Sequence, residues 1–106
     1  MTGKQSEQVP LQVRVTVVVE LERGKPIGLD AFTLSVDAGG GLLEMSLKVS
    51  KGQTLLLFNP CTGQHESCTV VSVRNARGGG FAVAFEFDRP LTQFWPIFFD
   101  RKIEAL

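Results

Sequence analysis

The sequence predicts an all-β fold, a small six-stranded antiparallel β-barrel. Short runs of alternating apolar and polar residues recur along the chain, rich in the β-branched and aromatic side chains that favour strands. Clusters of Gly, Pro and Asn separate them at about the eight-to-twelve-residue spacing typical of barrels and sandwiches. No long amphipathic stretch lies between the runs, so a parallel sheet with crossover helices is not expected. A chain of 106 residues accommodates one domain.

The first two predicted strands carry the clearest alternation. In residues 11–22 every odd position is apolar, which predicts one buried face and one polar face that includes Arg14. In residues 32–37 the pattern predicts that Phe32, Leu34 and Val36 share a face. This strand is expected to stop at Gly39–Gly41, because glycine backbone adopts turn conformations readily.

Four further strands complete the predicted barrel. A third begins at 42–45, and the fourth, at 54–58, is apolar enough to be buried on both faces. A turn at 59–63 leads to the fifth, at 67–74, where Cys68, Val70 and Ser72 are expected to share a face. A glycine turn at 77–80 precedes the sixth strand, which ends at Pro90. Its large residues share one face: Phe81, Val83, Phe85 and Phe87. The aromatic cluster at 94–99 is expected to cap an open end of the barrel.

Composition argues against several classes of protein. Eleven basic and eleven acidic residues cancel, so the chain lacks the positive charge expected of a protein that binds nucleic acid polymers. No run approaches the roughly 18 apolar residues that suggest a membrane-spanning helix. The first eight residues are polar and do not resemble a secretory signal. We therefore expect a cytoplasmic protein without membrane insertion.

Candidate chemistry is sparse. Cys61, His65 and Cys68 lie close together in the sequence, but a structural zinc site usually takes four ligands, so no metal and no cofactor is expected. The alternation of Cys68 with Val70 predicts a small buried residue. No Ser–His–acid arrangement surrounds the single histidine, and no enzymatic activity is predicted.

The order and spacing of several segments resemble the PilZ domain family. The resemblance covers residues 9–99, between a polar N-terminal arm at 1–8 and a C-terminal tail at 100–106. The segments that carry it are Gly40–Leu43, Val49–Gln53, Leu57–Gly63, Cys68–Val73, Val83–Phe87 and Phe94–Ile97. This resemblance implies a β-barrel, in agreement with the alternation.

The resemblance also implies a position for a cyclic di-GMP site. The family binds this dinucleotide through two arginines separated by three residues before the first strand, and through a D/N-x-S-x-x-G motif. Here Lys4 and Gln8 stand at the arginine positions. Ser35 stands at the Asp/Asn position, Asp37 at the serine position and Gly40 at the glycine position, so only the glycine matches.

Two functions follow as expectations from this comparison. The first is a divergent PilZ-like regulatory or interaction domain that contacts a partner protein, of a pilus, motility or polysaccharide system, with cyclic di-GMP binding weak or lost. The second is a cyclic di-GMP receptor with non-standard residues, using Lys4, Arg14, Arg23 or Ser35. An enzyme or metal site is the least favoured interpretation.

Overall fold

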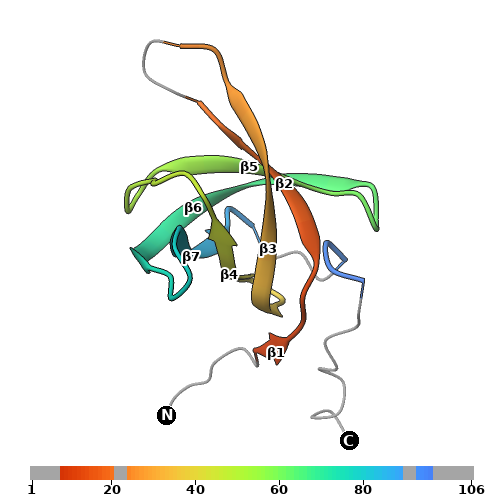
Figure 1. Ribbon diagram of the computed structural model, residues 1–106. Helices are drawn as coiled ribbons and strands as arrows, with labels where there is room; N and C mark the ends of the chain where they lie inside the picture. The colour runs from red at the N-terminus through yellow and green to blue at the C-terminus, as the bar shows by residue number, and fades with distance from the viewer. Residues whose placement is uncertain (1–7, 21–23, 90–92, 97–106) are drawn as a thin grey trace, which may run out of the picture.

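The computed structural model describes residues 8–20, 24–89 and 93–96, and within these ranges the protein is all-β (Figure 1). None of the described residues forms a helix long and apolar enough to cross a membrane. The predicted fold class is confirmed. The strands are β1 (Val9–Pro10), β2 (Arg14–Val19), β3 (Ile27–Asp37), β4 (Gly40–Met45), β5 (Thr54–Asn59), β6 (Gln64–Asn75) and β7 (Phe81–Phe87).

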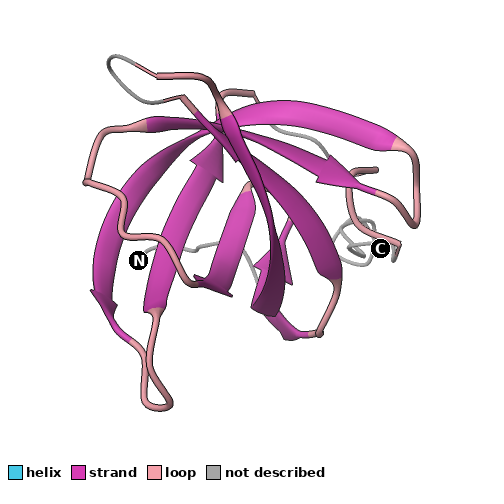
Figure 2. Ribbon diagram, turned by 45° about the horizontal axis from the view of Figure 1, so that its top comes forward, coloured by secondary structure: helices cyan, strands magenta, loops and turns pink. Residues whose placement is uncertain are grey.

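Six of these strands form a closed antiparallel barrel, and β1 is an additional short strand (Figure 2). The order is β1-β3-β2-β5-β6-β7-β4, and the pairing of β3 with β4 closes the ring. Closure removes the exposed edges that an open sheet would present. The inward side chains form one hydrophobic core, to which all six barrel strands contribute.

The predicted strand at 11–22 is interrupted near its start. β3 pairs with β2 through residues 27–32 and with β1 through residues 35–36, on the same edge. Between these two pairings the fully buried Thr33 takes over the hydrogen bonding. Its hydroxyl accepts from Val13 N (2.7 Å) and donates to Leu11 O (2.6 Å), while Thr33 N donates to Val13 O (3.0 Å). One side chain therefore joins β1 to β2. The predicted apolar face is confirmed where β2 is described, since Val13 to Val19 alternate as buried positions.

Two β-bulges overturn the facial assignments predicted for β3 and β6. The register of β3 shifts between Thr33 and Ser35, and that of β6 between Val70 and Ser72, so Leu34 and Val71 are extra residues. An extra residue reverses the alternation beyond it. Phe32 and Leu34 consequently lie outside rather than beside the buried Val36. Likewise, Ser72 is exposed, whereas the prediction placed it with the buried Cys68 and Val70.

Two other predictions are corrected by the pairing. β5 is buried on one face only: Leu55 and Leu57 point inward, while Leu56 and Phe58 remain 44% and 40% exposed. A barrel strand has an outer face, and no second layer of described residues covers this one. The turn after β3 consists of Ala38 and Gly39 alone, because Gly40 and its neighbour already belong to β4.

Aromatic residues close one end of the barrel, as predicted. Phe94 and Trp95 are buried and pack against Phe85 and Phe87, with ring centroids 4.8 to 6.2 Å apart among the contacting pairs. The buried Asn59 amide holds this segment by donating to Phe94 O (2.8 Å). Pro90, the aromatic residues at 98–99 and the tail at 100–106 lie outside the described residues.

Thr33→Val should lower the free energy of unfolding by about 1–3 kcal/mol, because the Val13 amide and the Leu11 carbonyl would lose their partner inside the protein. Urea denaturation followed by the fluorescence of Trp95 measures this. The matched control is Thr54→Val on the exposed face of β5, which should stay within about 0.5 kcal/mol. Equal stability of the two variants would show that Thr33 does not bridge β1 and β2.

Candidate functional site

Three of the six residues predicted for a ligand site come together on the outer surface. The pairing of Val9 with Val36 brings Gln8 alongside the end of β3. There Ser35 Oγ donates to Gln8 Oε1 (3.4 Å), and Gln8 Nε2 donates to Asp37 Oδ2 (3.5 Å). These long contacts are weak hydrogen bonds. The family resemblance implied one ligand site for these residues, and in the structure they are neighbours although 27 and 29 residues separate them in the chain.

Arg14, another predicted residue, does not join this group. Arg14 lies on the outer face of β2 beside Phe32, and its guanidinium is 3.9 Å from Asp30. Both side chains are about 60% exposed, so this ion pair contributes little stability. Lys4 lies outside the described residues.

Gly40, the sole match to the family motif, has a packing reason to be glycine. A Cβ at this position would lie 2.1 Å from the carbonyl oxygen of Phe85 on β7, a distance no real contact reaches. Its own carbonyl accepts from the indole nitrogen of Trp95 (3.2 Å), which also donates to Asp37 O (2.9 Å). Gly40 is buried, so the close approach of β4 to β7 accounts for this residue without any ligand.

A surface hollow of about 430 Å³ adjoins this group, at the end of the barrel where the β3–β4 turn meets the end of β7. Its volume is within the roughly 300–1,000 Å³ range of ligand sites. Gln8 and Asp37 line one side, and Val71, Asp88 and Arg89 line the other. Ala84 and Glu86 of β7, together with Gly39, Gly41, Phe85 and Phe87, complete the lining.

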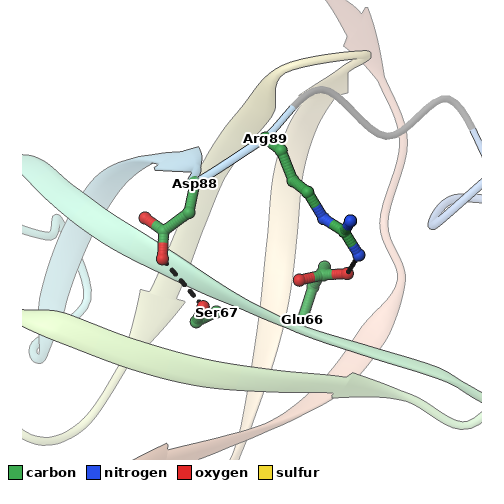
Figure 3. A network of polar contacts seen from close by, with 4 residues as sticks. All are labelled: Glu66, Ser67, Asp88 and Arg89. Atoms are coloured by element: carbon green, nitrogen blue, oxygen red, sulfur yellow. Dashed lines mark hydrogen bonds and ion pairs between the residues drawn. The ribbon is translucent and has the colours of Figure 1, made fainter.

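The far side of the hollow is held by side chains that the sequence analysis did not single out as a site. Asp88 accepts hydrogen bonds from Ser67 Oγ (2.7 Å) and Thr69 Oγ1 (3.0 Å), both on β6. The guanidinium of Arg89 lies 3.0 Å from the Glu66 carboxylate (Figure 3). Glu86 and Asp88 are acidic residues at alternate positions, a pattern from which the sequence could have indicated an acidic outer surface. Only the pairing of β6 with β7, however, brings Asp88 to the hydroxyls of Ser67 and Thr69.

The hollow is acidic. Three carboxylates line it, from Asp37, Glu86 and Asp88, against the single guanidinium of Arg89 among the described lining residues. That guanidinium is already within ion-pair distance of Glu66. The lining therefore attracts cations and repels phosphate groups.

The cysteines and the histidine are separated by the fold. Cys61 is exposed in the β5–β6 turn, His65 lies opposite Phe58, and Cys68 is fully buried in the core, as predicted for it. Among the described residues, no three potential metal ligands gather at one place. Burial raises the pKa of the Cys68 thiol to about 12, and the negative charge of Asp88 adds to the effect.

No protein family matches the chain, and no curated protein is detectably similar to it. The PilZ resemblance rests on the quoted segments of the sequence and stays a prediction.

Gly40→Ala should destabilise the barrel by at least about 1–3 kcal/mol, because the added methyl group overlaps the backbone of β7. Gly39→Ala is the matched control: its Cβ would meet Asp37 Oδ1 at 3.6 Å, an ordinary contact, so the unfolding free energy should hold or rise slightly. Thermal and urea unfolding without ligand measure both. A Gly40→Ala protein as stable as Gly39→Ala would contradict the packing argument.

The two thiols should react very differently. A disulfide reagent should modify one thiol in the native protein, Cys61, and two after denaturation, because Cys68 is buried and protonated.

The raised pKa also means that native Cys68 keeps its proton where the unfolded chain loses it. Stability linked to Cys68 is therefore present below about pH 9 and falls as pH rises towards about 12. Cys68→Ala, which has no thiol to ionise, should lose less stability over this range, and an equal loss would argue against the shift.

Proposed function

We propose that this chain is a PilZ-like regulatory interaction domain of the cyclic di-GMP signalling type, which contacts a partner protein and binds cyclic di-GMP weakly or not at all. The observation that carries the proposal is the acidic lining of the hollow beside Gln8, Ser35 and Asp37, where the resemblance places the dinucleotide. We propose no catalytic activity for it.

The charges of this region oppose those of the ligand. Cyclic di-GMP carries two phosphates, and guanidinium groups bind phosphate well because they are planar, charged and able to form paired hydrogen bonds. Gln8 occupies one expected arginine position, and its amide is hydrogen-bonded to Ser35 and Asp37. Each lost hydrogen bond to a charged group costs about 1.5–3 kcal/mol. Three nearby carboxylates add repulsion, so a binding loss of several orders of magnitude is expected.

A role in protein contact is supported by the outer surface of the barrel. Among the described residues, six large apolar side chains are exposed there: Ile27, Phe32, Leu34, Leu56, Phe58 and Val71. They lie on three strands, β3, β5 and β6, and adjoining exposed apolar groups, such as Leu56 and Phe58 on β5, are typical of interaction surfaces. The class of partner, a protein of a pilus, motility or polysaccharide system, comes from the family resemblance. The proposed cytoplasmic location comes from the polar start of the sequence and the lack of a long apolar run.

Retained cyclic di-GMP binding is the second candidate, and one observation favours it. Gln8, Ser35 and Asp37 do converge, and their amide, hydroxyl and carboxylate are groups that hydrogen-bond the edge of guanine. In this alternative the charge would come from Lys4 or Arg23, which lie outside the described residues, or from Arg14 if it left Asp30.

Calorimetric titration of the full chain with cyclic di-GMP separates these candidates. We expect no saturable heat at high ligand concentration, because the hollow repels phosphate. Saturable binding with micromolar or tighter affinity would overturn the proposed function and support the receptor.

The double variant Lys4→Arg, Gln8→Arg tests the assignment of the two arginine positions. It should gain measurable affinity for cyclic di-GMP, since it restores two guanidinium groups and one positive charge. The matched control is Lys51→Arg, Gln64→Arg, which makes the same changes at exposed positions outside the hollow and should gain nothing. Equal behaviour of the two double variants would contradict the alignment.

A further inference from the structure

The outer face of one half of the barrel carries an aliphatic row beside an acidic row. The strands β3, β4, β7 and β6 are consecutive neighbours here, with β4 between β3 and β7 (Figure 1). Ser35 pairs with Leu42, Leu42 with Ala84, and Ala84 with Ser72. Residues paired across strands point to the same face. Leu34 and Val71 have no partner in this ladder, but they are exposed and directly precede Ser35 and Ser72. We call Leu34, Leu42, Ala84 and Val71 the aliphatic row.

Both β-bulges add to this row. Leu34 and Val71 are the two extra residues, one on each side of the same Leu42–Ala84 pair, and each is 39% exposed. A bulge re-aims a side chain, and bulges are common next to functional sites. The core does not require either residue, since neither is buried. The two register shifts therefore place aliphatic side chains outward at one level of the barrel.

The acidic row lies one step further along the same strands. Asp37 pairs with Gly40, Gly40 with Glu86, and Glu86 with Thr69. The hydroxyls of Ser67 and Thr69 orient Asp88 next to them. We define the acidic row as Asp37, Glu86 and Asp88. Asp37 and Glu86 lie two residues further along their strands than Ser35 and Ala84, which corresponds to about 7 Å. The small residues Gly39, Gly41 and Ala84 are among those that line the hollow.

A partner must bind this face through side chains. β4 is paired with β3 and β7, and β7 is paired with β4 and β6, so neither strand has a free edge to accept another strand. Strand addition is therefore not available here. Among the modes that bind through side chains, we consider a helix laid across the strands, because its dimensions can be compared with those of the aliphatic row. Four strands about 4.8 Å apart make the row roughly 14 Å long. Two turns of α-helix advance about 11 Å and present apolar side chains along one side.

We propose that the aliphatic and acidic rows together bind an amphipathic α-helix of a partner protein. Its apolar side contacts Leu34, Leu42 and Val71, and lysine or arginine side chains next to that apolar side reach into the hollow toward Asp37, Glu86 and Asp88. The charge complementarity selects a basic helix over an acidic one. This inference rests on the proposed function, because it names the partner chemistry of an interaction domain.

The other exposed apolar pair, Leu56 and Phe58 on β5, lacks this charge pattern. Leu56 pairs with Ser67 and Val18, while Phe58 pairs with His65 and Thr16. None of these partners is a carboxylate. Leu56 is therefore a matched control: its exposure of 44% resembles the 39% of Val71, but it is outside both rows.

The test uses the full chain and a synthetic helical peptide as the probe. The peptide has leucines at positions i, i+3, i+4 and i+7, with lysines next to them, and its binding is followed by fluorescence anisotropy. We expect saturable binding that weakens as salt concentration rises, because the charges are exposed. A peptide with glutamates in place of the lysines should not bind. No saturable binding of the basic peptide, or equal binding of both peptides, would overturn the proposal.

Single variants then locate the binding face. Glu86→Lys and Val71→Lys should each lower the affinity for the basic peptide by at least about tenfold. Both introduce a charge of the same sign as the peptide; the first also removes an attracting carboxylate, and the second removes an apolar contact. Leu56→Lys should leave its affinity within about twofold of the parent protein. Trp95 fluorescence and thermal unfolding confirm that each variant is folded. Binding that falls equally in Leu56→Lys and Val71→Lys would overturn the assignment of this face.

Failure here is distinguishable from failure of the proposed function. If the basic peptide does not bind and cyclic di-GMP does not bind, the helix proposal falls and the interaction domain stands. Saturable cyclic di-GMP binding removes the proposed function, whatever the peptide does.

Discussion

The barrel closes where β3 pairs with β4, and the other features of the structure depend on that contact. The turn between them has two residues, so β4 returns directly against β3 and its first residue meets the backbone of β7. Gly40 permits that approach because a methyl group would overlap the Phe85 carbonyl. The indole of Trp95 ties both sides of the turn through Asp37 O and Gly40 O. Closure, the aromatic cap and the position of Asp37 are thus one physical arrangement.

The two bulges connect the fold to its surface. Each gives its strand one residue more than its neighbour, which increases the local twist that a closed sheet needs. Each also leaves an aliphatic side chain outside, at Leu34 and Val71. The same irregularity that lets β3 and β6 follow the barrel therefore shapes its outer face. Structure and surface are coupled here because a strand cannot gain a residue without moving side chains from one face to the other.

Beside the hollow, strand pairing sets the position of the residues, whereas their side chains set the chemistry. Gln8, Ser35 and Asp37 are held together by the pairing of β1 with β3, and this arrangement is independent of their charge. Their functional groups are an amide, a hydroxyl and a carboxylate. The carboxylates of Glu86 on β7 and of Asp88, which follows β7, line the same hollow. Such a surface suits a cation. The acidic character of this surface is the reason for proposing protein contact rather than nucleotide binding.

The sequence by itself determined the fold class, the strands and most of their inward faces, because period-two alternation and Gly or Pro breaks are local signals. It also predicted the burial of Cys68. The grouping of Gln8, Ser35 and Asp37 came from the family resemblance rather than from any local signal. Only the tertiary structure decided the bulges at Leu34 and Val71, the break bridged by Thr33, and the meeting of Asp88 with Ser67 and Thr69. These features depend on the register between strands distant in the chain. A residue carries no local mark of the partner it will face, so register emerges only when the barrel closes.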